Sequence, residues 1–212
     1  MSKVLYITAH PLTEERSSSL ATGKAFIEEY QKANPHDDIV HINLYRDYIP
    51  MIDADVMNGW EKLRAGGTFD QLTEQEQGKV ARLNELVDQF VGADKYVFVT
   101  PFWNLSYPPM LKAYLDAVSV AGKAFKYVAG GQLVGLLTEK KALHIQARGS
   151  VFAESPYAEL EMGHRHLEIM MKFFGLPGLE ALILEGLDRT EFNREEIKEN
   201  AVRRAKELAY TF

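Results

Sequence analysis

Short apolar runs alternate with longer amphipathic segments along most of the chain. Apolar residues are nearly continuous at 4–7, 96–99, 142–145 and 179–184, and they alternate with polar residues at 38–44. Runs of this length, rich in β-branched and aromatic residues, are typical of strands, and the continuous ones of strands buried on both faces. The pattern therefore predicts five strands of a parallel sheet.

The segments between these runs carry apolar residues at helical spacing. Thr73 followed by Glu76 forms a capping-box pattern, and Gly92 ends the helix that begins there. Gly175 ends another. The expected helices span 19–32, 54–64, 73–92, 109–120, 159–174 and 194–208.

Two segments depart from this alternation. Residues 46–72 are less regular and long for a plain connection, so we expect them to be functional or part of an interface. Residues 124–138 have strand character on both sides of Gly130-Gly131, which predicts a β-hairpin or lid.

Five buried strands alternating with helices predict an α/β fold. We expect a single domain over 1–212, built as a doubly wound five-stranded parallel sheet in the order 2-1-3-4-5, with helices on both faces. Ligands of such sheets bind at the carboxyl ends of the strands, near the point where the strand order reverses. That rule nominates the loops 9–19, 101–108 and 146–152.

The amino-acid composition excludes several kinds of partner and reaction. The 212 residues include 30 acidic and 24 basic side chains, with a formal net charge of −6, which argues against nucleic acid or an anionic membrane as a partner. There is no cysteine, which removes disulfides, thiolate nucleophiles and iron–sulfur clusters. Any redox chemistry must therefore come from a bound cofactor.

Nothing in the sequence predicts export or membrane insertion. The apolar run at the N-terminus stops at His10-Pro11 and is too short for a signal peptide or a membrane span. No other stretch approaches 18 apolar residues. We expect a cytoplasmic protein.

The first nominated loop ends in Ser17, Ser18 and Ser19 and opens a helix. Hydroxyls and free amides at the positive end of a helix dipole can bind an anion, and a phosphate site lined by serine fits a mononucleotide. No glycine-rich phosphate motif is present in this loop. The serines could also do no more than cap the helix.

The second loop, 101–109, places Phe102, Trp103 and Asn104 where a strand ends. A flat heteroaromatic ring needs an apolar wall with a few donors and acceptors along its edge, which aromatic side chains and loop amides supply. In the third loop, Gly149 lets the backbone approach a ligand, and Arg148 adds a cation. Ordinary core aromatics and a surface turn are the alternatives.

With these residues the chain resembles the FMN-dependent NADH-azoreductases, also called NAD(P)H quinone oxidoreductases, of the flavodoxin-like superfamily. The resemblance covers essentially the whole chain. Its most specific part is the P-x-x-N loop followed by PxLKAYLD at this spacing. The matching elements are Lys3-Val4-Leu5, Ser17 and Ser19, Pro101 to Asn104, Pro109 to Asp116, Lys123 to Phe125, and Arg148-Gly149.

The resemblance implies one FMN per subunit. The serines would hold its phosphate, the second loop would border the isoalloxazine, and the third loop would line the opposite rim. His10 and Ser150 depart from the residues frequent in the family and could change local polarity. The implied cofactor-binding residues are His10, Ser17, Ser18, Ser19, Pro101, Phe102, Trp103, Asn104, Leu105, Ala147, Arg148, Gly149 and Ser150.

The resemblance also implies an activity and an assembly. NADH or NADPH would reduce the flavin in a ping-pong cycle, and quinones or aromatic azo compounds would be the acceptors. Because the flavin performs the chemistry, no side chain is assigned as catalytic. Relatives are homodimers with active sites at the interface, and Phe125, Tyr127 and Trp103 are our candidates for the substrate pocket.

Three other functions were weighed. A metal site at Glu161, His164 and His166 is disfavoured because the two histidines point about 200° apart on a helix, and we expect no metal. A serine hydrolase lacks its G-x-S-x-G motif. A non-enzymatic flavodoxin that carries electrons shares fold and cofactor, so it stays the main alternative.

Overall fold

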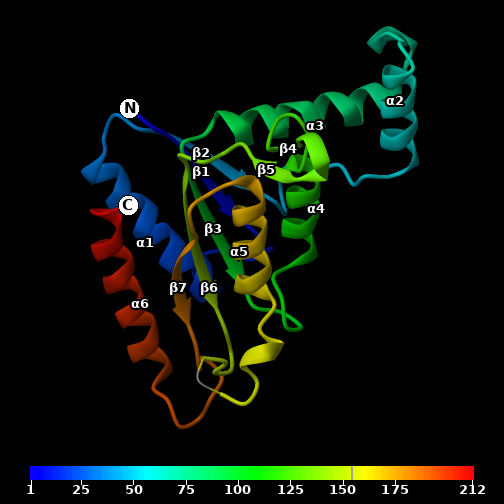
Figure 1. The fold of residues 1–212 in the computed structure, drawn as a ribbon. Helices are drawn as coiled ribbons and strands as arrows, with labels where there is room; N and C mark the ends of the chain where they lie inside the picture. The colour runs from blue at the N-terminus through cyan, green and yellow to red at the C-terminus, as the bar shows by residue number, and fades with distance from the viewer. Residues whose placement is uncertain (154) are drawn as a thin grey trace.

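A computed structural model describes residues 1–153 and 155–212, and its central element is the expected five-stranded parallel sheet (Figure 1). The strand order is β2-β1-β3-β6-β7. This is 2-1-3-4-5 when the sheet strands are counted along the chain, so the predicted fold is confirmed. The strands are β1 Lys3–Thr8, β2 Asp38–Asn43, β3 Lys95–Pro101, β6 Lys141–Ala147 and β7 Glu180–Leu184.

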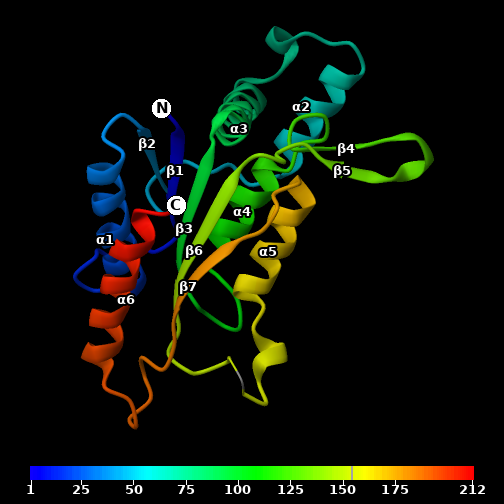
Figure 2. The same ribbon diagram turned by 60° about the vertical axis from the view of Figure 1, so that its left-hand side comes forward.

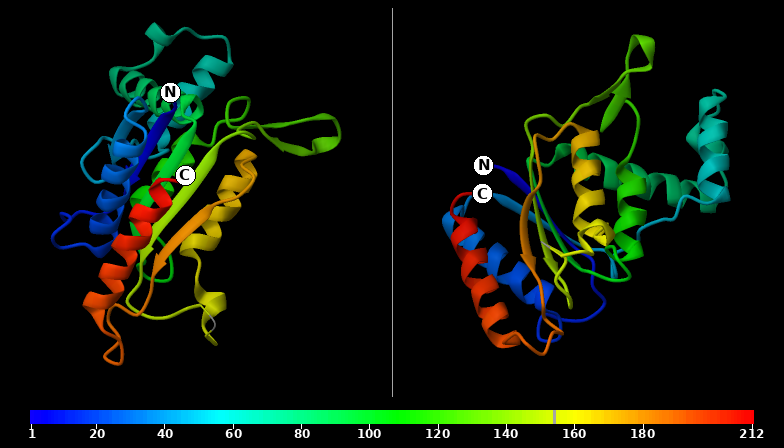
Figure 3. Two further views of the ribbon diagram at one scale, coloured as in Figure 1. Left: turned by 90° about the vertical axis from the view of Figure 1, so that its left-hand side faces the viewer. Right: turned by 60° about the horizontal axis from the view of Figure 1, so that its bottom comes forward.

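Helices cover both faces of the sheet (Figure 3). On one face α1 and α6 lie side by side, and on the other lie α3, α4 and α5. Alternate residues of β3 divide between the two cores, since Val97 and Val99 pack toward α1 while Tyr96 and Phe98 pack toward α4. The helices are α1 Ser18–Ala33, α2 Ala54–Arg64, α3 Glu74–Gly92, α4 Pro109–Val118, α5 Gly163–Phe174 and α6 Arg194–Ala209.

Local signals explain several helix ends. The Thr73 hydroxyl accepts the amide of Glu76, and the Glu76 carboxylate accepts the amide of Thr73, so the predicted capping box is confirmed. Gly175 ends α5 with φ 99°, a left-handed conformation that glycine adopts without strain.

One expected boundary is wrong. We expected a helix over 159–174, but α5 begins at Gly163, and Ala158–Leu160 forms a separate short 3₁₀ turn. The reason is Glu161, whose backbone is extended and whose carboxylate accepts the amides of His164 and Arg165. Glu161 thus caps the helix from outside it.

The predicted hairpin is confirmed. Strands β4 Phe125–Tyr127 and β5 Leu133–Gly135 pair antiparallel, and Gly130 and Gly131 both have positive φ at the turn. The hairpin projects from the end of the sheet where the strands begin (Figure 2). Helix α2, within the irregular segment 46–72, also stands away from the sheet, beside the far end of α3 (Figure 1).

Candidate functional site

The start of α1 forms the first wall of the site. Ser17 is the N-cap, and its hydroxyl accepts the amide of Leu20 at 3.3 Å and lies 3.1 Å from the hydroxyl of Ser19. Both serines are buried. The first-turn amides have no partner within a helix, so they and the helix dipole are suited to an anion. Ser17 therefore caps the helix, and this cap does not use up all the amides of the first turn.

Gly23 determines how close α1 lies to the sheet. A Cβ atom on Gly23 would lie 2.7 Å from Cγ2 of Val99 and 2.8 Å from the Tyr6 hydroxyl. No side chain fits that space, because such a contact is shorter than carbon atoms allow. The close approach places the first turn of α1 beside the end of β3.

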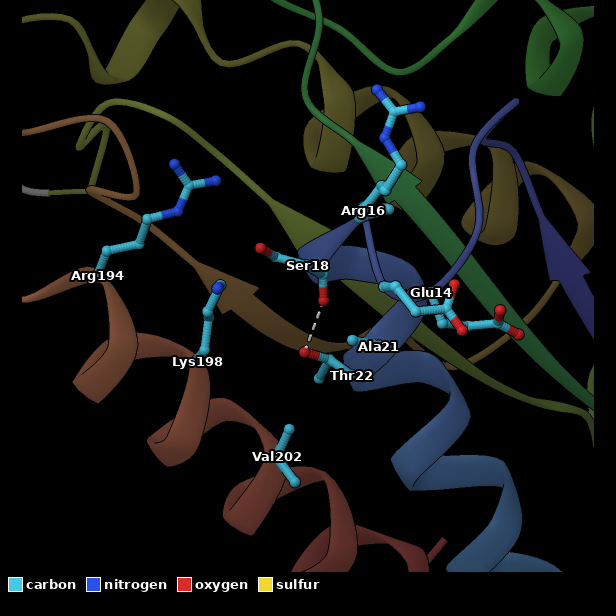
Figure 4. Close-up of a pocket in the computed structure, with 10 residues that line it drawn as sticks. Glu14, Arg16, Ser18, Ala21, Thr22, Arg194, Lys198 and Val202 are labelled. Carbon is cyan, nitrogen blue, oxygen red and sulfur yellow. Dashed lines mark hydrogen bonds between the residues drawn. The ribbon is translucent and has the colours of Figure 1, made fainter.

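Basic side chains surround this first turn (Figure 4). Arg16 precedes α1, while Arg194 and Lys198 come from the start of α6. Two adjoining cavities share Arg16, Ser17, Ser18 and Arg194. Arg194 is loosely paired with Asp188 at 3.7 Å, and Lys198 is paired with Glu195 at 2.8 Å. Acidic side chains line these cavities too, Glu14 and Glu15 the first and Asp188 the second, so basic and acidic groups both lie beside the first turn of α1.

The loop after β3 is a tight turn. The amide of Trp103 donates to the carbonyl of Ser106, and the amide of Ser106 donates back, at 2.7 and 2.9 Å. Asn104 and Leu105 between them have φ of 47° and 68°, as in a type I′ turn. Asn tolerates this conformation, whereas Leu is strained there. The amides of Asn104 and Leu105 have no acceptor within the described ranges, so they are free for a ligand.

His10 is a neutral donor at the edge of the site. Its Nδ1 accepts the amide of Leu12 at 3.0 Å, so the ring proton resides on Nε2. Burial lowers the pKa of His10, which keeps the ring uncharged. Its centroid lies 5.4 Å from that of Trp103, and both residues line the same cavity as Ser17 to Ser19.

The loop after β6 meets the loop after β3. The amide of Phe102 donates to the carbonyl of Ala147 at 2.8 Å, and the Phe102 and Phe152 rings meet edge to face with centroids 4.7 Å apart. The Arg148 guanidinium does not point freely into the cavity, because Glu161 and Glu185 hold it at 3.1 and 2.8 Å. The expected cation is therefore present but paired.

The three nominated loops do meet in one cavity at the carboxyl ends of the strands. Ten of the thirteen predicted cofactor-binding residues line it, whereas Asn104, Leu105 and Ser150 do not; Asn104 and Ser150 directly follow lining residues along the chain. The lining residues that were predicted are His10, Ser17, Ser18, Ser19, Pro101, Phe102, Trp103, Ala147, Arg148 and Gly149.

Two predicted pocket residues lie elsewhere. Phe125 and Tyr127 are on the hairpin, at the opposite end of the sheet from this cavity (Figure 2). Phe125 is buried against Phe173, with ring centroids 4.4 Å apart, whereas Tyr127 is 66% exposed. Within its own chain the hairpin does not cover the site.

A fourth wall was not predicted from the sequence. Leu187 and Asp188, in the connection from β7 to α6, and Arg194, the first residue of α6, also line the cavity, as does Arg16 in the first nominated loop. The sequence could have indicated this wall, because the connection also leaves the carboxyl edge of the sheet, where ligands bind. The strand that it follows, β7, lies at the edge of the sheet, two strands beyond the reversal of strand order between β1 and β3.

The Glu161-x-x-His164 motif has a structural explanation. Glu161 caps α5, His164 Nδ1 lies 3.2 Å from His144 Nδ1, and His166 contacts the Tyr107 hydroxyl. Over residues 1–153 and 155–212 no three His, Asp or Glu side chains are grouped as metal ligands. In the same ranges, no helix combines the length and apolar character needed to cross a bilayer.

Comparisons with known proteins agree with this architecture. A family model described as a flavodoxin-like fold matches residues 2–209. The FMN-dependent NADH:quinone oxidoreductase of Geobacillus kaustophilus is 58% identical, and the FMN-dependent NADH:quinone oxidoreductase 2 of Bacillus subtilis is 59% identical. Each match covers 100% of both chains.

Solved structures are similar over the same length. An azoreductase from Bacillus anthracis has a TM-score of 0.90 at 37% identity, and covers 100% of both chains. An FMN-dependent NADH-azoreductase from the same species, in complex with FMN, has a TM-score of 0.91 at 35% identity, with 99% of this chain and 98% of that one covered.

Proposed function

Since the chain belongs to the family with the flavodoxin-like fold, we propose that it is an FMN-dependent NADH:quinone oxidoreductase that also cleaves aromatic azo compounds to amines. The quinone activity and the donor NADH follow the relatives with 58 and 59% identity, and the azo activity follows the solved neighbours. The observation that carries the proposal is the single cavity that joins a serine-capped helix start to an aromatic turn.

The residues present fit FMN. A mononucleotide carries one phosphate, and the first turn of α1 offers one anion site lined by buried serines. Phe102 and Trp103 supply apolar surface for a flat ring, and free amides at Asn104 and Leu105 supply donors for its edge. One FMN per subunit, held within a single domain over 1–212, is the arrangement we propose.

Neutral hydrogen-bond donors and positively charged side chains together hold the phosphate of FMN. Ser17, Ser18 and Ser19 present hydroxyls and amides, and His10 adds its Nε2 proton. Arg16 and Arg194 flank them and neutralise the dianion. An uncharged His10 donates to the phosphate without needing a proton from solvent.

The end of the site that would border the isoalloxazine ring of FMN positions the reactants. When bound, FMN accepts hydride from NADH and passes two electrons to the acceptor. Trp103 and Leu105, which are 38% and 42% exposed, offer apolar surface on which a quinone or an azo compound can pack and exclude water. The backbone amides of the turn orient the ring edge, and no side chain needs to act as a nucleophile.

We further propose a homodimer whose active sites lie at the subunit interface. The projecting elements carry exposed apolar side chains that a monomer has no use for. Because the hairpin and the cavity of one chain lie at opposite ends of its sheet, Tyr127 can only serve the cavity of a partner. The exposed residues are Tyr48, Met51, Ile52, Met57, Tyr127, Val128 and Leu133.

Sedimentation of the purified protein tests the assembly. We expect a dimer at micromolar concentration, and a shift toward monomer on Met57→Glu, which places a charge on the projecting α2. A monomeric wild-type protein would contradict the interface. NADH is a cytoplasmic donor, which supports a cytoplasmic location.

Turnover tests the activity. The FMN-loaded protein should consume NADH with menadione and with an azo dye, and the flavin released by heat should be FMN rather than FAD. A protein that binds FMN but turns over neither acceptor would instead be a flavodoxin-type carrier, the alternative that the names of the full-length relatives disfavour.

A further inference from the structure

Arg148 lies at the centre of a buried charged cluster. Its side chain is 5% exposed, and its Nε donates to Oε1 of Gln146 at 2.8 Å. Its Nη1 donates to Oε1 of Glu185 at 2.8 Å, and Nη2 lies 3.1 Å from Oε1 of Glu161. The guanidinium carbon lies 5.3 Å from the centroid of the Phe102 ring. Every nitrogen of the side chain is therefore engaged within the protein.

Glu185 connects this cluster to the loop after β6. Its Oε1 accepts the amide of Phe152 at 3.1 Å, and its Oε2 accepts the amide of Ala153 at 3.2 Å. Glu185 directly follows β7, so its carboxylate joins the end of one strand to the loop that leaves its neighbour. Bonds from amides to a carboxylate are stronger than those between neutral groups.

Glu161 connects the same guanidinium to α5. Its Oε1 accepts the amide of His164 at 2.7 Å while also pairing with Arg148. The helix start is also packed closely here, since a Cβ on Gly163 would lie 2.7 Å from Nε2 of Gln146 and 3.1 Å from the Phe102 ring, so a side chain there would require these neighbours to shift. The start of α5 is thus fixed against the aromatic loop.

The cluster is anchored in the sheet. Gln146 is fully buried, and its Nε2 donates to the hydroxyl of Thr100 on β3 at 3.2 Å. The Thr100 hydroxyl in turn lies 2.9 Å from Nε2 of His144. A side chain with this many hydrogen bonds and ion pairs has little conformational freedom. Arg148 can therefore fix the positions of the loops around it.

Arg148, Glu161 and Glu185 bring three charges close together. Two carboxylates, with side chains 12% and 16% exposed, share one guanidinium. Removing Arg148 would leave two like charges in a poorly solvated place, which is strongly destabilising. Removing either carboxylate leaves a neutral pair, which is a milder change and a better experimental probe.

The loop that the cluster fixes carries free donors. The amides of Gly149, Ser150 and Val151 have no acceptor among the residues described, and Gly149 lines the cavity. We infer that Glu161 and Glu185 are positioning residues: joined to each other by Arg148, they hold the loop that carries these amides and the start of α5 in place for the cofactor. The inference rests on the proposed FMN site, and neither carboxylate touches FMN itself.

Two measurements on the FMN-loaded protein test this. Hydrogen exchange reports the protection of the Phe152 and Ala153 amides, and flavin fluorescence after dilution reports FMN release. The probe variants are Glu185→Gln and Glu161→Gln. The matched controls are Glu180→Gln, at the exposed start of β7, and Glu168→Gln, which pairs with Lys172 on the surface of α5.

We expect faster exchange at Phe152 and Ala153 in Glu185→Gln, and FMN release at least tenfold faster in both probes, with neither change in the controls. If Glu185→Gln does not fold, Glu185→Asp keeps the charge but shortens the reach, and the same two readouts apply. Unchanged exchange, or changed exchange with wild-type FMN release, would overturn the inference. Failure of the wild-type protein to bind FMN would instead overturn the proposed function.

Discussion

The Nδ1 atoms of His144 and His164 lie 3.2 Å apart, with the two rings nearly parallel at 13°. In a hydrogen bond between them, one nitrogen must donate and the other accept. Burial lowers the pKa of His164, and it lowers the pKa of the fully buried His144 well below the usual value.

The pair predicts how stability depends on pH. A folded-state pKa below the unfolded value of about 6.5 means that the unfolded chain binds more protons below that pH. The contribution of the two neutral histidines to the free energy of unfolding is therefore complete above pH 6.5 and is lost as the pH falls toward 5. Each group can contribute a slope of up to about 1.4 kcal/mol per pH unit.

Urea unfolding between pH 7 and pH 5 measures this slope. We expect His164→Asn to reduce the slope relative to the wild-type protein, and His36→Asn, on the exposed surface, to leave it unchanged. Equal slopes in all three proteins would show that the pair does not titrate in this range.

Gly23→Ala should displace α1. The added Cβ meets Val99 and Tyr6 at under 3 Å, so we expect a loss of about 1–3 kcal/mol in the free energy of unfolding together with weaker FMN binding. Gly78→Ala, within α3 and with nothing near its Cβ, should stabilise by about 0.5–1 kcal/mol. Thermal melts and FMN titrations distinguish the two, and equal effects would contradict the packing argument.

Leu105→Asn should stabilise the protein. Leu105 has φ 68°, a conformation that costs a branched side chain about 1 kcal/mol and that Asn adopts more readily. Its side chain is 42% exposed, so little burial is lost. Leu133→Asn has similar exposure in a regular strand and should gain nothing. A melting temperature that falls equally in both variants would argue against strain at Leu105.

Arg194→Gln should weaken FMN binding by about tenfold, since a hydrogen bond between charged groups contributes about 1.5–3 kcal/mol and salt screens part of it. The difference from wild type should shrink as salt increases. Arg203→Gln, further along α6 and outside the cavity, is the control. An effect that does not depend on salt would mean that Arg194 acts through packing instead.

Sequence patterns predicted the sheet well because its three central strands are buried on both faces and its helices have local end signals. The capping box at Thr73 and the glycine that ends α5 are read from a few neighbouring residues. The predicted start of α5 was wrong because Glu161, expected inside the helix, has an extended backbone and caps the helix from outside it, while its carboxylate also pairs with the distant Arg148.

The site was predicted where a loop follows a strand at the reversal of strand order. Serines and aromatics in those loops carried the prediction. The pairing of Arg148 with Glu161 and Glu185 could not be predicted, because it depends on how three separate loops meet. For the same reason, sequence alone did not show that Phe125 is buried while Tyr127 is exposed.

The turn at Asn104 and Leu105 and the loop at 149–151 lie beside the cavity and carry amides without an acceptor among the residues described, which in the proposed site would be main-chain donors to FMN. A donor that belongs to the backbone survives almost any substitution of its own side chain. Evolution can therefore exchange the side chains that select an acceptor while the cofactor stays bound, provided that the turn keeps its shape.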